Sequence, residues 1–193
     1  MNEERSHDRS ETKDRVAAGL EERARILEVL AVCFYRRNAM SQSTSLKDEA
    51  ADRVEIRELI DAYAHHADRR RPEDQAALFT QDALVEVYQG EPEKNKPVQV
   101  THGRAELASA LGVLKNYDMT MHFNGQNTLT IDGDKAAGEV YCLAHHFSVE
   151  HGQRTLTVMG IRYYDTYARQ NGHWLFAERK LIIDWVDRRP SNP

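Results

Sequence analysis

The sequence predicts an α+β fold, in which a strongly curved, mixed or antiparallel sheet wraps on three helices. Up to about residue 114, apart from two short predicted strands, apolar residues recur at three- and four-residue spacing, which is typical of helices, and after it they alternate in long segments. Helices gathered ahead of strands are typical of α+β architecture. The later strands are expected to be much longer than the usual length of about 5–6 residues, which indicates a sheet that bends around an enclosed space.

Residues 1–45 are expected to form an extension ahead of the domain. Charged residues dominate positions 1–15, which predicts disorder. Apolar residues at helical spacing predict an extra amphipathic helix at about 16–37, and small polar residues then form a linker. Because Met40 precedes this linker as an initiating methionine would, we hypothesise that residues 1–39 result from the choice of start site.

The domain itself is expected to span residues 46–188, followed by a short tail at 189–193. A stripe of Val, Ile, Leu and Tyr predicts its first helix over 51–67. Pro72 suits the first turn of a short second helix, and a third helix is expected from Gly103 to about 114.

Six strands are expected between turn-forming segments. A loop rich in Pro, Glu and Lys joins the first two, and the dipeptides Asp132-Gly133, His151-Gly152 and Asn171-Gly172 separate the last four. The expected strands are 83–88, 98–101, 119–131, 135–149, 154–169 and 173–186.

Composition excludes several classes of partner. The formal net charge of -5 argues against nucleic acid, because phosphate binding needs a concentrated basic surface. The two cysteines make no disulfide framework, which favours a reducing compartment, and the acidic first residues do not suit a signal or transit peptide. The longest apolar run, 26–35, is too short to cross a bilayer. We therefore expect a soluble, cytoplasmic protein that binds neither nucleic acid nor membrane.

Short motifs follow one another along the domain in a fixed order. They are Ile56–Tyr63, Asp68, Ala77–Ala83, His122–Gly125, Tyr163–Tyr167 and Gly172–Phe176. In this order the chain resembles the SnoaL-like branch of the nuclear transport factor 2-like superfamily over about residues 46–188. The resemblance implies a cone-shaped fold around a cavity, but it fixes no single activity because this scaffold hosts many functions.

The resemblance also implies a set of catalytic residues. In scytalone dehydratase, bile-acid 7-alpha dehydratase and hexachlorocyclohexane dehydrochlorinase, a helix-end aspartate pairs with a strand histidine at the cavity floor. Asp68 and His122 fall on these positions. Tyr63 matches an assisting tyrosine of the bile-acid enzyme, and His146 matches a second active-site histidine of scytalone dehydratase. The later serine and asparagine of that enzyme correspond to Ile161 and Tyr163 here, so its mode of substrate recognition is not implied.

Strand alternation offers an independent view of the same residues. His146 shares a face with the small residues Cys142 and Ala144, which leaves room for a ligand; a surface histidine is the alternative. The same reasoning places Asn124 beside His122, with Met121 and Phe123 turned towards the helices.

The last strand carries an arginine among apolar residues. Alternation places Leu175, Ala177, Arg179, Leu181, Ile183 and Trp185 on one face. A lone arginine there would be costly unless it is paired or functional, so Arg179 either steers the substrate or forms a structural salt bridge, with Asp68 or Asp184 as the expected partner. We expect Arg179, Asn124, Tyr163 and Trp185 to contact the substrate.

Asp68 also has a structural alternative, because an aspartate shortly before Pro72 is common helix-capping chemistry.

Metal and cofactor sites are not expected. The histidine pairs at 65–66 and 145–146 are adjacent in sequence and point apart, and no glycine-rich nucleotide motif or nucleophile elbow is present.

Together these features predict a cofactor-independent lyase or isomerase of the dehydratase type. His122 would remove a proton from a small, cyclic, apolar substrate, Asp68 would support it, and Tyr63 or His146 would protonate the leaving hydroxyl. The alternatives are a ligand-binding or assembly module without catalysis, and a polyketide cyclase-like or ring-hydroxylase small-subunit role. A partly apolar outer sheet face predicts a homodimer or homotrimer.

Overall fold

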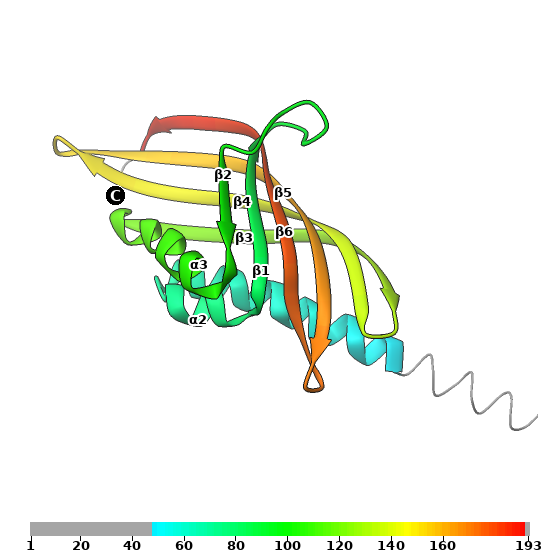
Figure 1. Ribbon diagram of the computed structural model, residues 1–193. Helices are drawn as coiled ribbons and strands as arrows, with labels where there is room; N and C mark the ends of the chain where they lie inside the picture. The colour runs from blue at the N-terminus through cyan, green and yellow to red at the C-terminus, as the bar shows by residue number, and fades with distance from the viewer. Residues whose placement is uncertain (1–47, 192–193) are drawn as a thin grey trace, which may run out of the picture. The chain divides into compact units, whose positions relative to one another are not determined.

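The computed structural model describes residues 48–191 (Figure 1). The expected disordered start, amphipathic helix, linker and start-site hypothesis at Met40 all lie outside these residues. The chain divides into two compact units, Met1–Ala50 and Ala51–Pro193, and the second of these carries the fold described below.

The helices cover the residues where helical spacing was found. The first described helix spans 48–68 and buries Ile56, Ile60 and Tyr63, which lie on one stripe of its surface. Helix α2 (Pro72–Ala77) starts with proline in its first turn, where the missing N–H costs no hydrogen bond. Helix α3 (Gly103–Leu111) is shorter than expected, because the chain tightens into the 3-10 helix η1 (Gly112–Asn116).

The strands form one six-stranded sheet in the order β2-β1-β6-β5-β4-β3 (Figure 1). Strands β1 and β6 are parallel, and all other neighbours are antiparallel. The sheet is curved and does not close, so the predicted α+β cone is confirmed. Its strands are β1 (Phe79–Gln89), β2 (Gln99–His102), β3 (Met119–Asp132), β4 (Lys135–Glu150), β5 (Gln153–Gln170) and β6 (His173–Pro190).

Two of the predicted turns show how local chemistry sets the strand register. Gln170 pairs with His173, so Asn171 and Gly172 form a two-residue turn, and both have positive φ (53° and 82°) as a type I′ hairpin requires. Between β3 and β4, Asp132 pairs with Lys135, so the turn residues are Gly133-Asp134, one position later than predicted.

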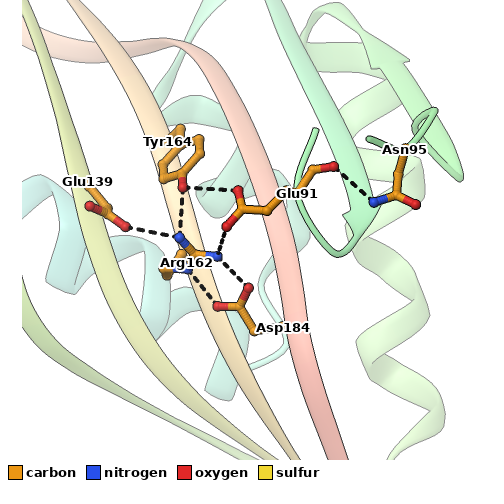
Figure 2. Close-up of polar contacts among 6 residues, drawn as sticks. All are labelled: Glu91, Asn95, Glu139, Arg162, Tyr164 and Asp184. Atoms are coloured by element: carbon orange, nitrogen blue, oxygen red, sulfur yellow. Dashed lines mark hydrogen bonds and ion pairs between the residues drawn. The ribbon is translucent and has the colours of Figure 1, made fainter. Parts of the chain in front are cut away.

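The loop between β1 and β2 is fastened to the sheet by Arg162 of β5 (Figure 2). Its Nη2 lies 2.6 Å from Glu91 Oε1 in the loop and 2.5 Å from Asp184 Oδ1 on β6. Its Nη1 donates to the Tyr164 hydroxyl at 2.8 Å and lies 3.6 Å from Glu139 Oε1. The Arg162 guanidinium group therefore anchors the loop that was predicted between the first two strands.

A bulge in β6 moves Trp185 to the outer face of the sheet. Ile183 pairs with Ile161, but Trp185 pairs with Gly160, so Asp184 is an extra residue. Trp185 is 49% exposed, and its ring packs so closely on Gly160 that a Cβ there would lie 2.2 Å from it. Counting alternate residues in the sequence cannot detect such an insertion. The prediction that Trp185 shares a face with Arg179 and Ile183 is therefore wrong.

A second bulge lies at Ala177, where the pairing passes from Phe176–Tyr167 to Glu178–Thr166. Before it, Phe176 is buried while Leu175 is partly exposed; after it, Arg179 is buried. The predicted inner face is therefore wrong for Leu175 as well.

The helices pack on the concave side of the sheet, and the side chains of His122 and His146 lie on this same side. Met121 and Phe123, expected to face helices, are instead 54% and 67% exposed. They belong to a convex face that also exposes Tyr141 and Leu143. The homodimer or homotrimer expected from an apolar outer face stays a prediction.

Candidate active site

A cavity of about 360 Å³ lies between the concave face of the sheet and the helices. Its wall is mostly aliphatic, with Val85, Leu107, Leu111, Met159 and Ile183 among the lining residues. No Lys, Arg, Asp or Glu lines it among residues 48–191. The volume lies at the lower end of the range for small-molecule sites, about 300–1,000 Å³.

Asp68 and His122 meet at this cavity. Asp68 is the last residue of the helix 48–68, and His122 lies in β3 and lines the cavity wall. His122 Nδ1 is 2.7 Å from Asp68 Oδ1, and the His122 backbone N–H donates to Asp68 Oδ2 at 3.0 Å. The His122 side chain is 8% exposed and that of Asp68 is 25% exposed.

These contacts determine the state of the aspartate. Burial alone would raise the pKa of Asp68, but the two hydrogen bonds from His122 outweigh it and the pKa is lowered. Asp68 is therefore a carboxylate at neutral pH and accepts the proton on Nδ1 of His122, which leaves Nε2 as the basic ring nitrogen. The capping alternative fails, because the N-cap of α2 is Arg71 and no side chain caps that helix.

His146 lies beside His122 on the concave face, as strand alternation predicted. It is 7% exposed, lines the cavity, and its ring centroid lies 5.3 Å from that of His122 and 4.5 Å from that of Tyr117. Burial, followed by the charge of His122, lowers its pKa to about 4. Neither ring nitrogen has a hydrogen-bond partner within the described part of the chain. His146 is therefore a neutral imidazole with one N–H free to donate.

Tyr63 and Tyr163 also line the cavity and stack against Arg179. Burial raises the pKa of both phenols, so each keeps its proton near neutral pH. The Arg179 guanidinium carbon lies 4.1 Å from each of the two ring centroids. Because the phenols keep their protons, either hydroxyl can act as a hydrogen-bond donor towards a ligand.

Arg179 itself is committed to an ion pair. Its Nε and Nη2 donate to the two oxygens of Asp165 at 2.7 Å and 2.8 Å, and both side chains are almost completely buried. Its partner is thus Asp165, not Asp68 or Asp184, and Arg179 is not among the cavity-lining residues. The arrangement matches the structural alternative given for this residue.

The other two expected substrate contacts lie outside the cavity. Asn124 Nδ2 donates to the Ile60 carbonyl at 3.2 Å and to Asp61 at 3.1 Å, which ties β3 to the helix 48–68. Trp185 lines a separate hollow on the convex face. Neither residue lines the cavity that holds His122.

Four polar residues of the cavity wall were missed from the sequence: Gln75, Gln99, Thr101 and Tyr117. Tyr117 follows η1, and Arg70 Nη2 holds this segment by donating to the Tyr117 carbonyl at 3.0 Å and the Asp118 carbonyl at 2.5 Å. No local pattern links residues 47 positions apart, whereas Gln75 could have been noticed as an uncharged polar residue in a short helix.

Over residues 48–191, no group of three His, Cys, Asp or Glu side chains is placed to hold a metal ion. No helix in this range is both long and apolar enough to cross a bilayer.

The fold is of the nuclear transport factor 2-like type. The chain belongs to the SnoaL-like domain family, which it matches over residues 48–180. An uncharacterized protein of Mycobacterium tuberculosis H37Rv is 28% identical to it over 133 residues, which cover 68% of this chain and 84% of that protein.

Solved structures show the same fold. A scytalone dehydratase-like protein from Novosphingobium aromaticivorans is 23% identical with a TM-score of 0.63, covering 75% of this chain and 94% of that one. Hexachlorocyclohexane dehydrochlorinase LinA-type3 from Novosphingobium barchaimii is 21% identical with a TM-score of 0.60, covering 75% and 92%. At these identities the likeness shows the fold and not the activity.

Proposed function

We propose that the protein is a cofactor-independent lyase or isomerase of the dehydratase type, acting on a small cyclic, largely apolar substrate. One observation carries the proposal: an ionised carboxylate lies 2.7 Å from an imidazole whose ring lines an otherwise apolar cavity. Several solved structures with this fold are described as dehydratases or dehydrochlorinases, which supports the same class of reaction.

In the proposed reaction, His122 Nε2 removes a proton from a carbon next to a carbonyl or aromatic system. Asp68 holds the required tautomer and stabilises the imidazolium that forms. The electron pair of the broken C–H bond forms a C=C bond as the C–O bond of the leaving hydroxyl breaks. The leaving hydroxide takes up a proton and departs as water.

In this proposal, two groups assist the leaving oxygen. His146 cannot act as a strong acid near neutral pH, since its pKa is about 4, but its neutral N–H can donate a hydrogen bond to that oxygen. The Tyr63 hydroxyl remains protonated and lines the same cavity. The proton captured by His122 is then the one available to complete the water molecule.

The test measures proton abstraction without requiring the natural substrate. 2-Tetralone in D₂O exchanges its α-protons, and deuterium incorporation is followed by NMR with the wild type and with Asp68→Asn. We expect the variant to fold. Its protein-dependent rate of deuterium incorporation should be about 100- to 10,000-fold lower than that of the wild type, which is the usual contribution of a positioned base.

Glu58→Gln is the matched control, since Glu58 is exposed on the same helix and should leave the rate unchanged. An Asp68→Asn rate near that of the wild type would refute the couple. Saturable binding of the ketone without any exchange by the wild type would favour the ligand-binding module instead.

A further inference from the structure

Gln75 lines the cavity and carries a buried amide nitrogen without a partner among the described residues. It lies in α2, is 1% exposed and lines the cavity wall. Its Nε2 is buried and has no hydrogen-bond partner among residues 48–191. Buried amide groups are almost always hydrogen-bonded, because leaving one unpaired costs free energy. This exception indicates that the partner of Nε2 arrives with a ligand.

Among the described residues, other donors also line the cavity, since His146 has an unpartnered N–H and Tyr63 and Tyr163 keep their protons, but none of these three residues lies on α2. On β2, Gln99 Nε2 donates to Thr101 Oγ1 at 3.4 Å, so these two wall residues bond to each other. His122 is bound to Asp68. Gln75 therefore adds a donor that belongs to a different structural element from the proposed base.

The charges around the cavity restrict what the acceptor can be. Among the described residues, the wall has no Lys or Arg, and the nearby guanidinium of Arg179 is paired with Asp165. A carboxylate or phosphate would be buried there without a counter-charge, which is strongly unfavourable. The acceptor is consequently an uncharged oxygen.

We propose that Gln75 Nε2 donates a hydrogen bond to a carbonyl or hydroxyl oxygen of an uncharged, oxygenated ring compound bound in the cavity. This inference rests on the proposed function in taking the same cavity as the substrate site, and it names the substrate class. A second fixed contact, apart from His122, would select which carbon of the ring faces the base.

Three probes of similar size test the inference by calorimetric titration of the full chain. 1-Tetralone and tetralin differ by one carbonyl oxygen, and 1-naphthoate carries a charge. We expect Gln75→Met to bind 1-tetralone about tenfold more weakly than the wild type, with tetralin binding no weaker, since a single hydrogen bond is lost. We expect 1-naphthoate to bind the wild type more weakly than 1-tetralone.

Gln81→Met is the matched control, because Gln81 is exposed on β1 and should leave all three affinities unchanged. Ligand-free Gln75→Met should also melt at a higher temperature than the wild type, since the substitution removes an unpaired buried donor. A lower melting temperature would show that the amide is already satisfied in the free protein, which would overturn the proposal.

Equal binding of 1-tetralone by the wild type and Gln75→Met would overturn the role of Gln75, and tighter binding of 1-naphthoate would overturn the uncharged class. If neither 1-tetralone nor tetralin binds the wild type, both the role of Gln75 and the uncharged substrate class are rejected. Asp68→Asn separates this inference from the proposed function: it should lose deuterium exchange yet keep the Gln75-dependent preference for 1-tetralone.

Discussion

The buried imidazole of His146 should make folding stability depend on pH. Its pKa falls from the ordinary 6.5 to about 4 in the folded protein, chiefly through burial. Between these values the unfolded chain binds a proton that the folded chain does not, so stability falls as the pH is lowered from about 6.5 to about 4. The full effect is about 3 kcal/mol, of which about 2 kcal/mol is lost by about pH 5.

The measurement compares urea unfolding of the wild type and His146→Leu at about pH 7.5 and about pH 5. Other groups titrate in both proteins, so the difference between their pH dependences isolates His146. We expect the wild type to lose about 2 kcal/mol more than His146→Leu over this interval. His65→Asn, which removes an exposed imidazole from the helix 48–68, should retain the wild-type dependence.

Parallel pH dependences of the wild type and His146→Leu would contradict the expected neutral state of His146. The role given to this residue, a neutral donor towards the leaving oxygen, would then have to be abandoned. A steeper loss in His146→Leu than in the wild type would have the wrong sign and would lead to the same conclusion.

Two further substitutions test the packing around the site. Arg179→Met should cost about 3–5 kcal/mol in urea unfolding, because the buried Asp165 carboxylate loses its counter-charge; adding Asp165→Leu should recover most of this loss, and a single-variant cost near zero would contradict the ion pair. Gly160→Ala should cost about 1–3 kcal/mol, because the new Cβ would lie 2.2 Å from the Trp185 ring. That cost should shrink in a Trp185→Ala background, and an equal cost in both backgrounds would refute the contact.

Local sequence chemistry accounts for most of the fold. The Asn171-Gly172 turn fixed the register of β5 on β6, and the apolar stripe through Ile56 and Ile60 placed the helix that packs on the sheet. Strand β1 begins four residues before its predicted start, because Thr80, Gln81 and Asp82 interrupt the alternation. Phe79 nonetheless pairs with Phe176 on β6, a contact that no local pattern contains.

The site was predictable where it rests on residue type and unpredictable where it rests on register. Asp68 and His122 could be found through their family positions, and His146 through the small residues on its strand face. The partner of Arg179 could not, because the bulge at Ala177 decides which side chains meet across β5 and β6. Trp185 lies outside the cavity that holds His122 for a similar reason, because the bulge at Asp184 turns it to the outer face.

Asp68 uses its two oxygens for two different contacts with His122. One accepts from the backbone N–H of His122 and so joins the end of the helix 48–68 to β3; the other accepts from the imidazole of the same residue. The contact with the backbone N–H fixes the position of the His122 main chain, and the contact with Nδ1 fixes the orientation of the imidazole ring. Because both contacts are made to one residue, the same carboxylate that positions His122 also sets its tautomer. In the proposed reaction, a base held in this way would need little reorganisation when its charge changes, which would favour proton abstraction in an apolar cavity.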